Sequence, residues 1–470
     1  MNTSLIACWR RGLLLTAGLL LSACSLIPAE GPPAPPLPAR YVEVPEVPAT
    51  ALADWWRQFG HAGLNAAIDA ALADNQDLAA ALARIDQARA SLRIAGAARW
   101  PTVDAGLGAT RTFISGDSFG GGFGNGFGGG GFGEGTSHQA SVNVSYELDV
   151  FGRIRAQTAA ASKRAIASAQ DRAAIELLLL ADVADGFITA TGLRERLTIA
   201  RANLLSNQQV LAIVEARLRE GATSRLEVAQ QRTTVANVEA AVAALDQQLR
   251  DNANALAVLQ GAPPDGAPVG APSLAVLTLP AIAPGLPALL LTRRPDLQRT
   301  EAELAAANAD IGVARAALLP TLTLGGSGNF GIDPVSTIGS LAASLAAPIF
   351  QGGRLAGEVE RTHARRAELL ANYRQAVLTA TREVQDALNA VNASARRRAA
   401  LKVAAAEAQV ATRLARERYL AGRIDFLTLL NSQVAEFSAE DAHVDARRAE
   451  FSAAIALYRA LGGGWSERAQ

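Results

Sequence analysis

The sequence carries one stretch twice, as DLAAALARIDQARASLRIAGAARWP at residues 77–101 and as DLQRTEAELAAANADIGVARAALLP at residues 296–320. Each copy begins with Asp-Leu and ends on a proline 24 residues later. A shorter landmark follows both copies, because FGR at residues 151–153 returns as FQGGR at residues 350–354. A unit of about 200 residues that occurs twice predicts a pseudo-symmetric architecture.

A long stretch without proline follows the first copy and has the pattern of an amphipathic helix. Between Gly152 and Glu220 the seam positions alternate by four and three residues, the seven-residue repeat of a left-handed coiled coil. These positions are Leu179, Val183, Gly186, Ala190, Leu193, Leu197, Ala200, Leu204, Asn207, Leu211, Val214 and Leu218. Gly221 ends the predicted helix, and a partner helix runs back over residues 226–259.

The second copy repeats this plan with a helix from Gly353 to Tyr419, a turn at Gly422 and a return helix. The seam expected on the return helix is Leu427, Leu430, Val434, Phe437, Asp441, Val444, Arg448, Phe451, Ile455 and Tyr458. Ahead of the first copy's strands, residues 54–99 are predicted to be one helical region. We therefore expect two coiled-coil hairpins of matched design.

Alternating apolar and polar residues predict two strands in each copy. The strands are expected at residues 103–112 and 140–150, and again at residues 321–330 and 338–349. Their length suits a tilted membrane-spanning strand, although a half-buried soluble hairpin has the same pattern. Residues 116–135 contain twelve glycines and interspersed phenylalanines, which indicates a flexible hairpin loop.

The number of strands bears on assembly. Four strands are too few to close a membrane barrel, and an open sheet edge is not tolerated in lipid. The chain must therefore associate with further copies if these strands span a membrane. Geometry alone permits two, three or four copies.

The N-terminus has the features of an export signal. Arg10 and Arg11 precede an apolar stretch at residues 12–21, and Leu-Ser-Ala-Cys closes it at Cys24. This ending resembles the bacterial lipobox, in which the cysteine is acylated and becomes the mature N-terminus; Ser25 after it favours delivery to the outer membrane. We expect a signal peptide at residues 1–23 and a lipid-anchored, Pro-rich tether at residues 24–53.

Composition argues against catalysis and nucleic-acid binding. The 44 basic residues balance 44 acidic residues, so no global field attracts nucleic acid. The four histidines, His61, His138, His363 and His443, have no ligand-spaced partners. No enzyme activity, catalytic residue, metal site or cofactor is predicted.

The chain resembles the TolC-like outer-membrane factors, in particular the NodT/OprM-type lipoproteins of tripartite efflux pumps. The resemblance covers essentially the whole mature chain. Its most specific motifs are YELDVFGRI at residues 146–154, RPDL at residues 294–297 with Glu301, Asn308, Ile311, Gly312 and Pro320, and ALGGGW at residues 460–465.

This resemblance implies a mixed α and β fold, mainly long helices in a coiled-coil α-barrel, with four strands per chain in a twelve-stranded transmembrane β-barrel. The implied assembly is a homotrimer in the outer membrane of a Gram-negative bacterium that projects into the periplasm. Its implied partners are a periplasmic adaptor protein and an inner-membrane RND-type pump. The expected function is a gated conduit that carries small molecules to the exterior.

The resemblance also assigns roles to residues at the two helix turns. The residues expected to contact the adaptor at the periplasmic tips are Gly221, Gly422, Leu226 and Leu427. The residues expected in the gate region are Arg418, Tyr419, Asp425, Thr428 and Asn431. Thr428 and Asn431 stand where relatives often carry aspartates, so an anionic ring at the entrance is in question.

Two alternatives remain open at this point. One is a type I protein-secretion duct, which shares the fold, and the other is a structural coiled-coil lipoprotein. We expect repeat 1 at residues 54–275 and repeat 2 at residues 276–470. The sequence leaves the exported compound undefined.

Overall fold

The computed structural model of the protein describes residues 27, 37–38, 41, 53–112, 135–264, 269–283, 285–333 and 335–463. The expected signal peptide, Cys24, most of the tether, residues 116–134 of the Gly/Phe loop and the closing Gly464-Trp465 lie outside the described residues.

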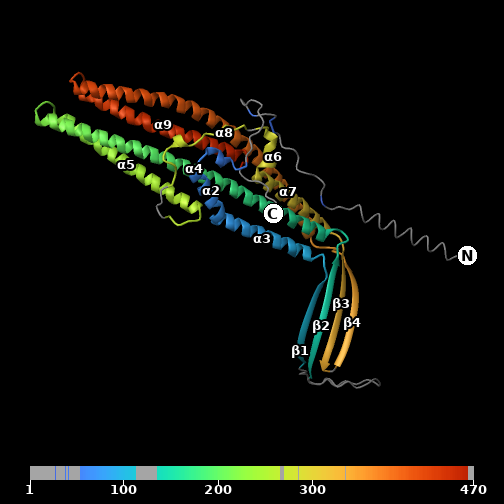
Figure 1. The fold of residues 1–470 in the computed structure, drawn as a ribbon. Coiled ribbons are helices and arrows are strands. Elements are labelled where there is room, and N and C mark those ends of the chain that lie inside the picture. Colours follow the sequence, from blue (N-terminus) through green and yellow to red (C-terminus); the bar gives the residue numbers. More distant parts are fainter. Residues whose placement is uncertain are drawn as a thin grey trace, which may run out of the picture. The chain divides into compact units, whose positions relative to one another are not determined.

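The same sequence of elements occurs twice along the chain (Figure 1). It first runs α3 (Gln76–Ala97), β1 (Thr102–Thr112), β2 (Gly135–Leu148), α4 (Arg153–Arg219) and α5 (Arg225–Leu259). It then runs α7 (Pro295–Ala316), β3 (Thr321–Asp333), β4 (Val335–Ala346), α8 (Arg354–Leu420) and α9 (Phe426–Ala460). Corresponding helices have equal lengths of 22, 67 and 35 residues, so the duplication seen in the sequence is a duplication of elements.

Short elements complete the chain: η1 (Trp55–Phe59), α2 (Ala62–Asp74), η2 (Leu274–Val276), η3 (Pro287–Leu289) and α6 (Leu290–Arg293). The region expected to be helical at residues 54–99 is helical, but it is divided into η1, α2 and α3. Gly60 ends η1 in the left-handed conformation, with φ of 71°, and Asn75 lies between α2 and α3. The Asn75 side-chain oxygen accepts hydrogen bonds from the backbone N–H groups of Asp77 at 2.9 Å and Leu78 at 3.0 Å. A side chain that caps a new helix start competes with continuation of the old helix.

The chain forms two compact units. Unit 1 is Met1–Pro33, Gln87–Ala165 and Ala302–Leu370, and unit 2 is Ala34–Asp86, Ile166–Glu301 and Ala371–Gln470. Each unit combines parts of both halves of the sequence. The repeat boundaries at residues 54–275 and 276–470 stay a prediction.

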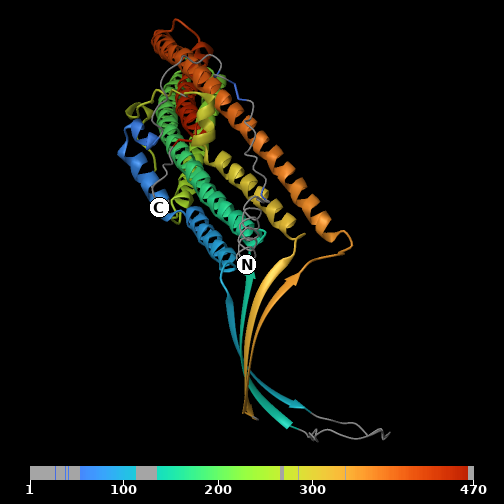
Figure 2. The ribbon, with the colours of Figure 1, turned by 90° about the vertical axis from the view of Figure 1, so that its right-hand side faces the viewer.

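Unit 1 contains one antiparallel sheet in the order β1-β2-β3-β4, whose strands twist strongly in Figure 2. The register places Val144 of β2 opposite Val103 of β1 and Gly326 of β3, with Leu341 of β4 next in the row. Because side chains alternate along each strand, this row and every second row from it form one apolar face. The row between them, which contains Asn143 and Ser327, lies on the other face. Within the described residues, β1 and β4 each keep one unpaired edge.

Two strands end earlier than expected. Strand β2 stops at Leu148 because Asp149 turns back to cap α4, where its carboxylate accepts from the N–H groups of Ile154 at 2.9 Å and Arg155 at 2.8 Å. Strand β4 stops at Ala346, shortly before Pro348, which has no N–H group to donate. The YELDVFGRI motif is therefore a strand end joined to a helix cap.

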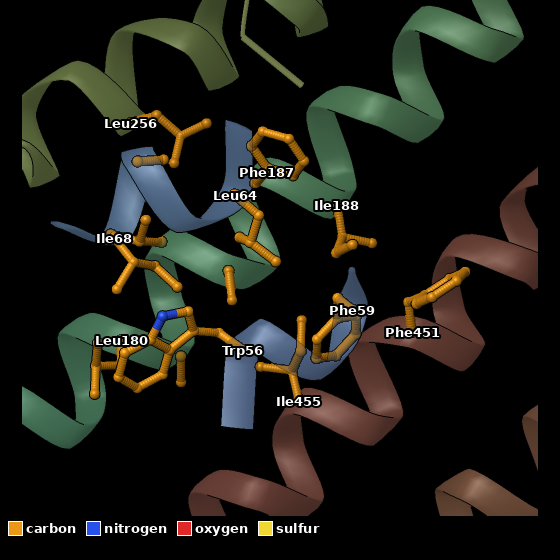
Figure 3. Close-up of a cluster of buried hydrophobic side chains, with 14 of the residues drawn as sticks. Trp56, Phe59, Leu64, Ile68, Leu180, Phe187, Ile188, Leu256, Phe451 and Ile455 are labelled. Carbon is orange, nitrogen blue, oxygen red and sulfur yellow. The ribbon is translucent and has the colours of Figure 1, made fainter. Parts of the chain in front are cut away.

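The main core of unit 2 forms around η1 (Figure 3). The Trp55 ring stacks on Tyr458 of α9 at 4.9 Å between centroids, and the Tyr458 hydroxyl contacts the Gln58 side-chain oxygen at 3.0 Å. Burial raises the pKa of Tyr458 to about 12. Gly186 of α4 makes room for Leu256 of α5, because a Cβ atom at residue 186 would lie 2.7 Å from the leucine Cδ2.

The predicted seam of α4 is confirmed. Its buried members are Leu179, Val183, Ala190, Leu193, Leu197, Ala200, Asn207 and Val214, and the other four positions are half-buried. On α9 the prediction holds at Val444, Phe451, Ile455 and Tyr458. Near the turn it was wrong, because Leu427 and Val434 are 52% and 51% exposed while Phe426, Leu429 and Gln433 are buried. The buried face advances by eleven residues from Gln433 to Val444, a period of about 3.67, so a strict seven-residue repeat drifts off it.

No helix in the described part of the chain is both long and apolar enough to cross a membrane.

Candidate functional site

The α4–α5 turn is a Schellman motif built around Gly221. The Gly221 N–H donates to the Leu218 carbonyl at 3.0 Å, and the Ala222 N–H donates to the Arg217 carbonyl at 2.8 Å. Gly221 has φ of 72°, the left-handed conformation that side chains disfavour. Ser224 then caps α5 by accepting from the Glu227 N–H at 3.4 Å.

The α8–α9 turn is built the same way around Gly422, which has φ of 65°. The N–H groups of Gly422 and Arg423 donate to the carbonyls of Tyr419 at 3.0 Å and Arg418 at 2.9 Å. Asp425 caps α9, and its Oδ1 accepts from the Thr428 N–H at 2.7 Å. Hydrogen bonds from the Thr428 side chain and backbone lower the pKa of Asp425, so this carboxylate is a helix cap as well as an exposed charge.

Both turn glycines face open space. A Cβ atom at Gly221 or Gly422 would meet no other atom within 4 Å. The left-handed backbone alone therefore demands glycine at these positions.

An apolar cluster beneath the turns joins the two helical hairpins. Its buried members are Val210, Val214, Val228, Ala415, Tyr419, Phe426 and Leu429. The Arg217 guanidinium lies 4.7 Å from the centroid of the Tyr419 ring, which also packs edge-to-face on Phe426 at 5.9 Å. A guanidinium within about 6 Å of an aromatic face is a cation–π contact. Arg217 of α4 and Tyr419 of α8 thus link one hairpin to the other.

The expected gate residues differ in exposure, because Tyr419 is buried and the other four are exposed. Tyr419 is buried, at 5% exposure, and its hydroxyl has no hydrogen-bond partner among the described residues. Arg418, Thr428 and Asn431 are exposed, and they form no common polar cluster with Tyr419 within the described part of the chain. Arg217 is not among the expected gate residues, although it lies four residues before Gly221, as Arg418 lies four residues before Gly422. Only the contact with Tyr419 distinguishes it.

The expected adaptor-contact residues lie on the outside of the turns. Leu226 is 65% exposed and Leu427 is 52% exposed. They occupy equivalent positions, five residues after Gly221 and Gly422 respectively. Each turn therefore presents an open glycine followed by an exposed leucine.

Buried amide side chains connect the two helices of the first hairpin, α4 and α5, next to the apolar cluster along the helices. The Gln231 Nε2 donates to the Asn207 backbone oxygen at 3.0 Å and contacts its Oδ1 at 3.1 Å, and Asn207 Nδ2 donates to the Asn203 backbone oxygen at 2.9 Å. In the second hairpin, the Thr412 hydroxyl donates to the Ser432 carbonyl at 2.8 Å. Buried polar contacts at a coiled-coil seam fix the register of the helices.

Arg294, part of the RPDL motif, is a buried charge in unit 2. Its guanidinium donates to Asp296 at 2.7 and 3.0 Å, to Glu383 of α8 at 2.6 Å and to the Ala460 carbonyl of α9 at 3.3 Å. Burial alone would lower the pKa of Arg294, but the hydrogen bonds and charges of Asp296 and Glu383 outweigh it and raise the pKa. The motif thus ties the start of α7 to the second hairpin.

Comparison with known proteins identifies the family. The family model described as outer membrane efflux protein matches residues 67–262 and 286–463. The chain belongs to the outer membrane efflux protein family. This efflux protein is 39% identical to the pyoverdine export outer membrane protein OpmQ of Pseudomonas aeruginosa over 464 residues, 97% of each chain. It is 32% identical to the toluene efflux pump outer membrane protein TtgI of Pseudomonas putida, over 97% of this chain and 98% of the relative.

Solved structures agree with this family. The open-state outer membrane channel MtrE of Neisseria gonorrhoeae superimposes with a TM-score of 0.82 at 26% identity, covering 94% of this chain and 98% of MtrE. The predicted fold class is confirmed, because the efflux protein has the TolC-like combination of long helices and a four-stranded sheet. The predicted function is likewise confirmed: the chain is the outer-membrane channel component of an efflux system.

Within the part of the chain that the structure describes, no three His, Cys, Asp or Glu side chains gather in an arrangement that could hold a metal ion. The family assignment makes the protein a transport component of the outer membrane.

Proposed function

We propose that the efflux protein works as a homotrimeric, gated conduit that is anchored by acylated Cys24 and operates with a periplasmic adaptor and an inner-membrane RND-type pump. The observation that supports association is the sheet, which among the described residues has one apolar face and an unpaired edge on both β1 and β4. The choice of three copies comes from the resemblance to the TolC-like channels. Alternating directions along the order β1-β2-β3-β4 allow β4 of one copy to pair antiparallel with β1 of the next. Three copies supply twelve strands, which supports a closed barrel without free edges.

The native mass of the mature protein tests this proposal. We expect a trimer after detergent extraction from outer membranes, and we expect the Cys24→Ala variant to lose its acyl chains while keeping the trimeric mass. A monomer in both proteins would refute the shared barrel. Mass spectrometry of the N-terminal peptide tests acylation separately.

The adaptor contact is proposed for Gly221, Gly422, Leu226 and Leu427. The open space over both glycines and the exposure of both leucines support it. We expect the double substitution of Leu226→Ser with Leu427→Ser to weaken co-purification of the adaptor while the trimer persists. Leu205→Ser, at an exposed leucine in the body of α4, is the matched control. If the Leu226→Ser/Leu427→Ser variant and the Leu205→Ser control lose adaptor binding equally, the turns are not part of the adaptor interface.

The gate is proposed at the same turns, with Tyr419 and Arg217 holding the hairpins together and Arg418, Asp425, Thr428 and Asn431 on the exposed surface around them.

Small organic molecules are proposed as cargo, supported by relatives named for pyoverdine export and toluene efflux. Deletion of the gene should raise the toxicity or retention of such a compound, and complementation should restore export.

A further inference from the structure

The duplication of the chain gives the Arg294 site a counterpart in the first repeat. Helix α7 begins 219 residues after α3 (295 − 76), and α8 and α9 begin 201 residues after α4 and α5 (354 − 153 and 426 − 225). These offsets match Asn75 with Arg294, Asp77 with Asp296, Asp182 with Glu383, and Leu259 with Ala460. Both places lie within unit 2. They can therefore be compared residue by residue.

Two glycines show that the backbone is built alike at both places. Gly261 follows α5 and Gly462 follows α9, and both have the left-handed conformation, with φ of 70° and 76°. A Cβ atom at Gly261 would clash with the carbonyl oxygen of Asp74, and one at Gly462 would lie 2.6 Å from the carbonyl oxygen of Arg293. Asp74 and Arg293 are themselves matched by the offset of 219 residues (293 − 74). The same close approach of chain segments therefore frames both places.

The central side chain differs between the two places. Arg294 donates to two carboxylates and to the carbonyl group at the end of α9. Asn75 is shorter, and its Nδ2 donates only to the matching carbonyl group, that of Leu259, at 2.8 Å. The carboxylates of Asp77 and Asp182 form no hydrogen bond or ion pair with another described residue. The first repeat thus keeps both carboxylates but has an asparagine in place of the arginine that would join them.

A cavity of about 350 Å³ lies beside Asn75 and between these carboxylates. Its charged lining residues are Asp77, Asp182 and Arg84, and its apolar lining includes Ile175, Leu178 and Leu259. The residues that match this apolar lining in the second repeat are smaller or polar, namely Ala376, Thr379 and Ala460. Pockets that bind small molecules have volumes of about 300–1,000 Å³ and mostly apolar walls. The cavity therefore has the size and the lining of a small-molecule site.

Arg84 does not take the place of the missing arginine. Its side chain is exposed and forms no ion pair with Asp77 or Asp182 in the described part of the chain. Two carboxylates against one guanidinium leave the lining with a net negative charge. The cavity therefore favours a cation.

We propose that this cavity binds a small amphipathic cation with a guanidinium group, which Asp77 and Asp182 hold while its alkyl part lies on Ile175, Leu178 and Leu259. The matching carboxylates of the second repeat already bind a guanidinium in the same backbone frame. A guanidinium has a planar fork of N–H donors that suits carboxylates better than the single point charge of an ammonium group.

Calorimetric titration of the mature, detergent-solubilised protein with butylguanidinium chloride tests the site. We expect saturable, stoichiometric binding, and a loss of affinity of about tenfold or more in Asp77→Asn and in Asp182→Asn, because each removes the acceptor of a charged hydrogen bond. Asp69→Asn removes the same charge from an exposed position of α2 and should leave the affinity unchanged. Butylurea, which has a similar shape and no charge, should not bind.

Three outcomes of this titration overturn the proposal. They are no saturable binding of butylguanidinium, equal weakening by Asp69→Asn, and equal binding of butylurea. An arginine from a second copy that filled the cavity in the assembled protein would give the first of these outcomes.

The second repeat suggests a variant that fills the cavity from within. Asn75→Arg supplies the guanidinium that the second repeat has at this position, so it should abolish binding of butylguanidinium. Asn75→Gln also loses the short side chain that caps α3 but adds no charge, and it should keep the affinity within a few-fold of the unmodified protein. Unchanged binding in Asn75→Arg, or equal loss in Asn75→Gln, overturns the match with the Arg294 site.

Arg84 provides the last control. Arg84→Gln removes a like charge from the lining and should tighten binding of butylguanidinium by a few-fold. Binding that is seen only in Arg84→Gln would mean that Arg84 itself occupies the cavity in solution, which overturns the proposal.

Discussion

The contact between Arg217 and Tyr419 makes a quantitative prediction about the closed state of the channel. The guanidinium lies 4.7 Å from the ring centroid and connects the first hairpin to the second, while the ring itself is almost fully buried. A cation–π contact at a partly desolvated site contributes about 0.5–2 kcal/mol. Its loss in one protomer should therefore change the closed-to-open ratio by a factor of roughly 2 to 30.

Single-channel recording in planar bilayers measures this ratio. Arg217→Gln removes the charge but keeps most of the side chain. Every protomer of the variant trimer loses the contact, so the closed-to-open ratio should fall by at least that factor. Arg219→Gln on the same helix turn changes the same net charge at an exposed position and should leave the open fraction near that of the unmodified channel. Tyr419→Phe keeps the ring and loses only a hydroxyl without a described partner, so it should not open the channel.

The double variant separates the contact from its surroundings. If the two side chains act through each other, Arg217→Gln should have little further effect in a channel that already carries Tyr419→Leu. High salt should also leave the closed state largely intact, because the contact is made to a buried ring and not to an exposed carboxylate. Equal opening by Arg217→Gln and Arg219→Gln, or fully additive effects in the double variant, would show that the contact does not hold the hairpins together.

Three further predictions concern stability, measured by thermal unfolding of the purified channel. Gly221→Ala should lower the free energy of unfolding by about 1–2 kcal/mol, because alanine must adopt a left-handed backbone but its Cβ meets no other atom. A loss of stability as large as that caused by a core cavity would show that the space around residue 221 is not open. Arg294→Met should cost about 1–3 kcal/mol through lost charged hydrogen bonds, since the carboxylates of its partners are partly solvated; a neutral result would mean that burial offsets them. Burial raises the pKa of Glu436, so the folded state holds its proton more tightly than the unfolded state and stability falls as pH rises through that carboxyl's range. Glu436→Gln should accordingly stabilise the protein at pH 7 and lose this advantage near pH 4, and a pH-independent effect would exclude the carboxyl as its source.

Much of this architecture could be predicted because it depends on local periodicity. Alternation of apolar residues in two strands of each copy predicted the sheet, and the long proline-free stretches predicted α4 and α8. Left-handed glycines at Gly221 and Gly422 marked both turns because only the local backbone requires them. Helix boundaries were harder to predict where they depend on a contact between distant parts of the chain. Asn75 ends α2 and begins α3, and its side-chain amide also donates to the Leu259 carbonyl at 2.8 Å.

The sequence by itself determined the duplicated plan of elements, the two-faced strands, the turns and the family. The tertiary structure alone decided which residues meet, Arg217 with Tyr419 and Arg294 with Glu383, and the drift of the buried face along α9. The physical reason is distance along the chain. Periodicity records which side of an element is apolar, but the partner of that side comes from segments far away in sequence and is set by how whole helices pack.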